Sequence, residues 1–165
     1  MTNQISTTFG SMPILSNIQN KYPDRKLIMY SATNKPNTIM LLDQTNEQSV
    51  FSSPVNFDIL AKTGNQNLNL FINFTTIFLG PEQQQVFDSK VNLLMTDLPY
   101  GMETIYSMHY QKDINRRVIL TSWQNPSDFD VWKNDVIDKW KNTYKNSQSF
   151  YFDSVSYKPI VSKKA

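Results

Sequence analysis

The sequence predicts an α+β protein in which helices cover one face of an antiparallel sheet. Four segments in the C-terminal two thirds alternate apolar and polar residues, as half-buried strands do. Two others carry apolar residues three and four positions apart, which is the spacing of an amphipathic helix. Their order is strand, helix, strand, strand, helix, strand, which is the ferredoxin-like pattern. A chain of 165 residues is long enough to bury a core for such a fold.

The first half of this pattern has clear start and stop signals. Residues 68–79 alternate and are rich in Phe, Ile and Thr, which predicts a strand that ends at Gly80. Pro81 suits the first position of a helix, and the helical spacing that follows extends to about Thr96. Turn residues at 99–101 then lead into a second alternating segment.

The second half continues with two strands joined by a hairpin, Met102–Tyr110 and Arg117–Trp123. Asn125 and Pro126 form a strong helix start, with Asn as the cap and Pro at the first position. A last strand is predicted over residues 150–157. The apolar face of the helix carries Phe129, Trp132, Val136 and Trp140. Because helices cover only one side of the sheet, its other face must also be buried, and such domains often dimerise through that face into a barrel.

The N-terminal part carries signals of its own. Residues 54–61 show helical spacing, and a Lys-Thr-Gly-Asn segment at 62–65 marks a boundary between domains 1–64 and 65–165. The first of these is marginal as an independent domain. We therefore expect a smaller α+β extension that packs on the C-terminal sheet, in the place that a second subunit would take. Its other predicted elements are a helix over 11–20 and strands over 26–31, 38–42 and 48–51.

Composition excludes several classes of function. The net charge is only +2, and Lys and Arg are scattered apart from Arg116-Arg117 and Lys163-Lys164, so we expect no nucleic-acid partner. The absence of cysteine excludes disulfides, thiolate metal sites and a cysteine nucleophile. The N-terminus lacks the regions of a signal peptide, and no apolar stretch reaches about 18 residues. We therefore expect a cytoplasmic protein without a membrane partner.

Three motifs occur together in the C-terminal part. They are Asn73 with Gly80 seven residues later, a Val-Ile-Leu-Thr-Ser-Trp strand that ends at Trp123, and a Phe-Asp-Val-Trp helix start at 129–132. Over roughly residues 71–157 they resemble the antibiotic-biosynthesis monooxygenase (ABM) superfamily, and within it the Isd-type haem-degrading monooxygenases. The whole chain resembles longer, two-part relatives, which include haem monooxygenases and the TRAP signalling proteins. The resemblance implies the dimeric α/β barrel type of ferredoxin-like fold.

The resemblance also implies haem as a cofactor. In the haem-degrading group, an Asn on the first strand lies near the bound oxygen, a Trp on the second helix distorts the haem, and a His ten residues later ligates the iron. Asn73 and Trp132 match the first two and are predicted as catalytic and haem-binding residues. The His position falls on Asn142, whose carboxamide is a poor iron ligand. Tyr144 is the alternative ligand if a nearby lysine stabilises its phenolate. We predict no metal site of other kinds.

Each of these residues also has a structural interpretation. The amide of Asn73 could satisfy a neighbouring backbone group, and Trp132 could be plain core, as we expect Trp123 and Trp140 to be. The one histidine of the chain, His109, lies on a different strand from the predicted haem site, and we expect it to be a surface or hydrogen-bonded residue.

Two functions therefore stay open. The first is an oxygen-dependent monooxygenase that acts on haem or on another flat aromatic molecule, such as a quinol, with haem as cofactor or with none. The second is a non-catalytic ligand-binding or regulatory protein, TRAP-like, that retains the fold. The expected partner is a small aromatic ligand. The chain is expected to be either a homodimer or a monomer with pseudo-dimeric halves.

Overall fold

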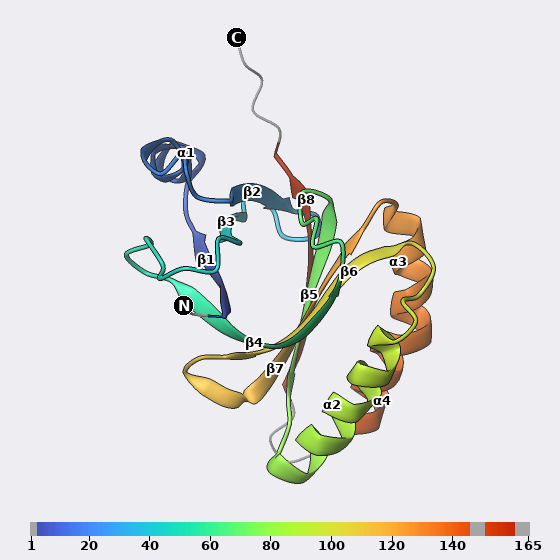
Figure 1. The fold of residues 1–165 in the computed structure, drawn as a ribbon. Helices are drawn as coiled ribbons and strands as arrows, with labels where there is room; N and C mark the ends of the chain where they lie inside the picture. The colour runs from blue at the N-terminus through green and yellow to red at the C-terminus, as the bar shows by residue number, and fades with distance from the viewer. Residues whose placement is uncertain (1–2, 146–150, 161–165) are drawn as a thin grey trace.

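The eight strands within the described residues form one closed barrel. The computed structural model describes residues 3–145 and 151–160. Around the barrel the strands follow the order β1-β3-β2-β8-β5-β7-β6-β4, and every pair is antiparallel (Figure 1). The strands are β1 (Gln4–Phe9), β2 (Leu27–Ala32), β3 (Ile39–Asp43), β4 (Val55–Gly64), β5 (Phe71–Phe78), β6 (Met102–Tyr110), β7 (Asp113–Trp123) and β8 (Phe152–Pro159).

Each half of the chain contributes four strands in the same spatial order. Around the barrel the first half runs β4-β1-β3-β2 and the second half runs β8-β5-β7-β6, which is the order fourth, first, third, second in both. The halves meet along two seams, β4 with β6 and β2 with β8. One chain therefore builds the closed barrel that two copies of a single ferredoxin-like unit would build.

The helices are unequally divided between the halves. The C-terminal sheet carries α2 (Pro81–Met95), and then α3 (Pro126–Trp132), a π-helical turn η1 (Lys133–Ile137) and α4 (Asp138–Tyr144), all on one face (Figure 1). The N-terminal half has one helix, α1 (Met12–Lys21), on the far side of the molecule. None of the described helices is both long enough and apolar enough to cross a membrane.

A polar loop takes the place of a second helix in the N-terminal half. Residues 44–54 cover the outer face of β1, whose side chains there are polar. Ser6 Oγ hydrogen-bonds to Ser49 Oγ at 2.8 Å, and Gln4 Nε2 donates to the Glu47 carbonyl at 2.9 Å. Buried hydroxyls and amides are tolerated when they are hydrogen-bonded in this way. The outer face of β1 is thus satisfied by hydrogen bonds rather than by apolar packing.

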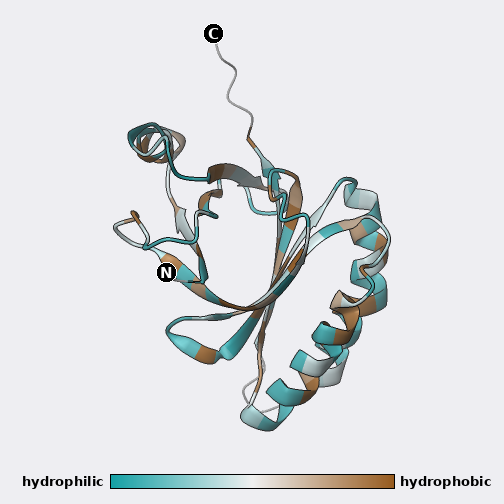
Figure 2. Ribbon diagram, viewed as in Figure 1, coloured by the Kyte–Doolittle hydropathy of each residue, from teal (hydrophilic) through white to brown (hydrophobic). Residues whose placement is uncertain are grey.

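Strand β5 separates two apolar cores. Ile72 and Phe74 point into the barrel and pack against Leu120 and Tyr157, whereas Ile77 points toward the helices. Figure 2 shows hydrophobic positions in brown on the strands and on the helices beside them. The core between sheet and helices is rich in aromatic side chains: Phe87, Trp123, Phe129, Trp132, Trp140 and Tyr144. Because both faces of β5 are buried in this way, the strand is mostly apolar.

The structure confirms the C-terminal elements and, in the N-terminal part, the helix over 11–20 and the strands over 26–31 and 38–42. Two other N-terminal predictions are wrong. Residues 54–61 are not a helix but belong to β4, because Val55, Phe57 and Ile59 line the barrel at a period of two. Leu60 and Ala61 follow Phe57 at three and four positions, which imitates helical spacing. The register of β4 shifts between Ile59 and Ala61, and this irregularity interrupts the alternation of the strand. The strand expected over 48–51 is loop, and β1 was not predicted at all. Of the last predicted strand, Phe150 lies outside the described residues, as does the Lys163-Lys164 tail.

Candidate functional site

Asn73 is buried on β5, on the face turned toward the helices, because it alternates with Ile72 and Phe74, which point into the barrel. Its Nδ2 donates to Ser154 Oγ and to Ser156 Oγ, both at 3.0 Å. Its Oδ1 accepts from Thr75 Oγ1 at 2.6 Å. A carboxamide has two donor hydrogens and one acceptor oxygen, so neighbouring hydroxyls engage all three groups of the Asn73 amide.

Trp132 ends α3 and is buried in the same interface, with 5% of its surface exposed. Its ring centroid lies 5.5 Å from that of Trp123 and 5.8 Å from that of Trp140, in the tilted and edge-on arrangements that aromatic pairs prefer. The indole Nε1 is buried without a hydrogen-bond partner among the described residues. A π-helical turn follows immediately, and such turns are frequent at functional sites.

Trp123 connects the Asn73 strand to the Trp132 ring. Thr121 is the register partner of Asn73 on β7, and its hydroxyl accepts from Trp123 Nε1 at 2.8 Å. The fold thus brings Asn73 and Trp132 to one interface between sheet and helices. Trp123 and Trp140 are buried core residues, as the sequence predicts. Trp123 is thus hydrogen-bonded to the register partner of Asn73 and packs against the ring of Trp132.

The two residues proposed to meet the iron lie on opposite sides of α4. Asn142 is exposed to solvent, whereas Tyr144 is buried and its ring centroid lies 6.3 Å from that of Phe87. Burial raises the pKa of the Tyr144 phenol above its ordinary value, which favours the neutral form. The Lys141 ammonium lies over the Phe152 ring instead, 5.6 Å from its centroid. Asn142 therefore points away from the interface, and the Tyr144 hydroxyl stays protonated.

Other ligands for a metal are lacking in the described part of the chain. The Nδ1–H of His109 donates to the carbonyl oxygen of its neighbour Tyr110 at 2.7 Å, and Nε2 lies 3.7 Å from Asp58 Oδ2, which confirms the expected hydrogen-bonded strand histidine. No group of three His, Cys, Asp or Glu side chains within residues 3–145 and 151–160 could hold a metal ion. The residues present do not fit haem in this arrangement, because the interface is filled and offers the iron neither an imidazole nor a phenolate.

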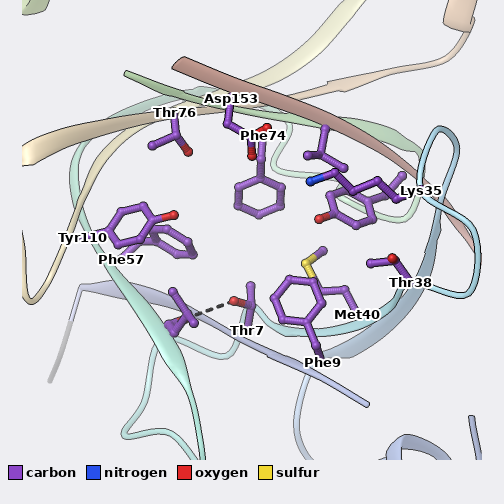
Figure 3. Close-up of a pocket in the computed structure, with 13 residues that line it drawn as sticks. Thr7, Phe9, Lys35, Thr38, Met40, Phe57, Phe74, Thr76, Tyr110 and Asp153 are labelled. Atoms are coloured by element: carbon purple, nitrogen blue, oxygen red, sulfur yellow. Dashed lines mark hydrogen bonds between the residues drawn. The ribbon is translucent and has the colours of Figure 1, made fainter. Parts of the chain in front are cut away.

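A different site, which the sequence does not indicate, opens at one end of the barrel (Figure 3). It is a cavity of about 230 Å³. Its aromatic wall consists of Phe57, Phe74, Tyr110 and Tyr157, which come from four different strands. The other lining residues are Thr7, Phe9, Lys35, Thr38, Met40, Val55, Thr76, Asp153 and Val155. Alternation along each strand hints at inward-facing aromatics, but only the barrel closure, which joins the two halves, brings them together.

Structural comparison places the chain among proteins of one fold. A monooxygenase-like protein from Listeria innocua shares 17% identity and a TM-score of 0.74, over 96% of this chain and 95% of that one. A major regulator of staphylococcal pathogenesis shares 13% identity and a TM-score of 0.72, over 96% of this chain and 99% of that one. A haem-degrading enzyme from Listeria monocytogenes shares 15% identity and a TM-score of 0.70, over 92% of this chain and 97% of that one. No protein-family model and no curated protein sequence matches the chain.

Identities of this size establish the fold and leave the activity open. Similar structures also include a protein from Listeria monocytogenes described as a ferredoxin-fold protein related to antibiotic-biosynthesis monooxygenases, with 16% identity and a TM-score of 0.73 over 95% of both chains. The strand order, the helices on one face and the near-complete coverage agree with this group. The chain therefore has the ferredoxin-like α/β-barrel fold of proteins related to the ABM superfamily.

Proposed function

We propose that the chain is a non-catalytic ligand-binding or regulatory protein that keeps the fold of the ABM-related proteins. The observation that carries this proposal is the filled interface between the C-terminal sheet and its helices. Asn73 is engaged by three neighbouring hydroxyls, Trp132 packs between two other tryptophans, and Asn142 faces solvent. That a staphylococcal regulator shares the fold supports the proposal at the level of the scaffold.

A flat ligand at this interface would have to displace buried aromatic side chains. Room for a ring system beside Asn73 requires Trp123 or Trp132 to leave the core, and removing a buried Trp or Phe side chain costs about 3–5 kcal/mol. An imidazole–iron bond would repay part of that cost, but position 142 holds a carboxamide on the exposed side of α4. A ligand therefore gains little at this interface.

A haem titration of the wild type and of Asn142→His tests the proposal. We expect no shift of the Soret band in either protein, because position 142 faces solvent and a histidine there would not reach the interface. A Thr143→His variant, one residue further along and also exposed, controls for adventitious surface ligation. A shifted Soret band that appears only in Asn142→His and decays with oxygen and a reductant would contradict the proposal.

A second candidate is an oxygen-dependent monooxygenase that acts on a flat aromatic molecule without a metal. The buried indole Nε1 of Trp132, which lacks an acceptor among the described residues, and the adjoining π-helical turn favour it. A substrate oxygen could accept that hydrogen bond if the helix moved outward. Oxygen uptake with a hydroquinone that exceeds the protein-free rate and is lost in Asn73→Ala would establish this candidate over the first.

A further inference from the structure

Four aromatic rings form a continuous wall along the cavity at the mouth of the barrel. The Phe57 and Tyr110 ring centroids lie 5.0 Å apart, those of Phe57 and Phe74 5.7 Å, and those of Phe74 and Tyr157 6.0 Å. Phe9, half exposed at the end of β1, adds a fifth ring at the entrance. Figure 3 shows the labelled rings around the open centre of the site. The π-faces of such rings carry negative potential.

One carboxylate stands beside this wall. Asp153 is half-buried on β8, and none of the ion pairs within residues 3–145 and 151–160 includes it. The charge of Asp153 acts on two phenols of the aromatic wall. Burial and, next, Asp153 raise the pKa of Tyr157 to about 12. Burial also raises the pKa of Tyr110, where Arg116 lowers it and Asp153 adds the smallest contribution that raises it. Both phenols therefore stay neutral near pH 7, so their rings and oxygens meet a ligand without charge.

The only other charged residue of the lining is Lys35, which lies on the connection between β2 and β3. It is exposed to solvent, whereas Asp153 is half-buried. In Figure 3 the Lys35 side chain extends from the right of the view toward the centre of the site, and Asp153 stands beside Phe74. Because a half-buried charge is screened less than an exposed one, Asp153 is the less screened of the two charges in the lining. Outside the lining, the Arg116 guanidinium lies 5.6 Å from the centroid of the Tyr110 ring.

We propose that the barrel mouth binds a small organic cation, an alkylated ammonium whose methyl groups lie against the aromatic wall while Asp153 neutralises its charge. Aromatic faces attract such cations and at the same time shield their methyl groups from water. The cavity of about 230 Å³ falls below the range of about 300–1,000 Å³ that is typical of sites for drug-sized molecules, which limits the ligand to a small one.

This site is separate from the interface between sheet and helices, and the inference does not depend on the proposed function. Asn73 and Trp132 are absent from its lining. Haem binding followed by oxygen-dependent breakdown would overturn the proposed function and leave the cation site standing. Failure of cation binding would leave the haem prediction untouched.

Choline and 3,3-dimethylbutan-1-ol, which share a shape and differ in charge, test the proposal on the full chain. We expect choline to bind at one saturable site, with chemical-shift changes at Tyr110 and Tyr157, and about tenfold more tightly than the neutral alcohol, as one buried cation–π contact predicts. Equal affinities for the two compounds, or no saturable binding of choline at concentrations up to about 10 mM, would overturn the proposal.

Two charge variants identify the source of the selectivity. Asp153→Asn keeps the shape of the side chain and should lose about tenfold in choline affinity, with little change for the alcohol. Lys35→Gln removes a like charge from the rim and should bind choline as tightly as the wild type or more tightly. Weaker binding in Lys35→Gln, or unchanged binding in Asp153→Asn, would contradict the assignment and favour an anionic ligand. Equal melting temperatures by circular dichroism establish that both variants are folded.

Discussion

Trp132→Ala is expected to lower the free energy of unfolding by about 3–5 kcal/mol, the usual cost of deleting a buried aromatic side chain. The Trp132 ring is 5% exposed and contacts the rings of Trp123, Phe129 and Trp140. Its loss leaves a hole at the centre of the aromatic core that joins α3 and α4 to the sheet. Urea unfolding, followed by far-UV circular dichroism, measures the change.

The neighbouring residue supplies a matched control. Val131 lies on the same helix but is 63% exposed, so Val131→Ala should change the stability by less than about 0.5 kcal/mol. Trp132→Phe should fall between the two, since it keeps a ring in the core. If Trp132→Ala were as mild as Val131→Ala, Trp132 would line open space rather than fill a core, and the site at this interface would have to be reconsidered.

Gly64→Ala is expected to lower the stability by about 3 kcal/mol or more, through strain rather than through lost packing. Gly64 has a φ of +109°, a conformation that side chains rarely adopt. A Cβ atom there would lie 2.1 Å from the Glu103 carbonyl oxygen and 2.8 Å from the Thr104 Cα, both backbone atoms that cannot move aside. The residue pairs with Thr104 on the seam between β4 and β6, so the substitution weakens the junction of the two halves.

Gly80→Ala serves as the comparison for Gly64→Ala. Gly80 has an ordinary φ of −67°, and the nearest atom to its added Cβ would be Gln83 Oε1 at 3.9 Å. As the N-cap of α2 it should lose about 1 kcal/mol or less, because Ala is a poorer cap than Gly. Thermal or urea unfolding of the two variants side by side gives the difference. Equal losses would show that the β4–β6 seam tolerates a side chain at position 64.

Local signals predict the C-terminal half of the fold well. Gly80 and Pro81 mark the start of α2, and Asn125 and Pro126 mark the start of α3, at the positions where the structure has them. The N-terminal half is harder to predict because its decisive interactions are distant in sequence. Residues of β1 look too polar for a buried strand until the loop at 44–54 is seen to hydrogen-bond them. The bulge in β4 likewise hides its alternation.

The candidate sites likewise combine features that the sequence predicts with features that depend on contacts between distant residues. The sequence suggests that Asn73 and Trp132 belong to one region, but it contains no signal that the hydroxyls of Ser154, Ser156 and Thr75 engage the Asn73 amide. The catalytic roles of Asn73 and Trp132 stay predictions, as do the oligomeric state and the domain boundary at residue 64. The aromatic wall at the barrel mouth could not be predicted, because its residues become neighbours only when β4 and β8 close the barrel against β6 and β2.

Acrylamide quenching of tryptophan fluorescence tests most directly whether a packed core stands at the place where the sequence resemblance predicts haem. The three tryptophans of the chain, Trp123, Trp132 and Trp140, all lie in this one core and are at most 7% exposed, so the native emission reports on nothing else. We predict a blue-shifted emission and a quenching constant several-fold below that of the urea-unfolded chain. A native quenching constant close to the unfolded value would mean that the interface is open to small molecules, and would contradict the claim.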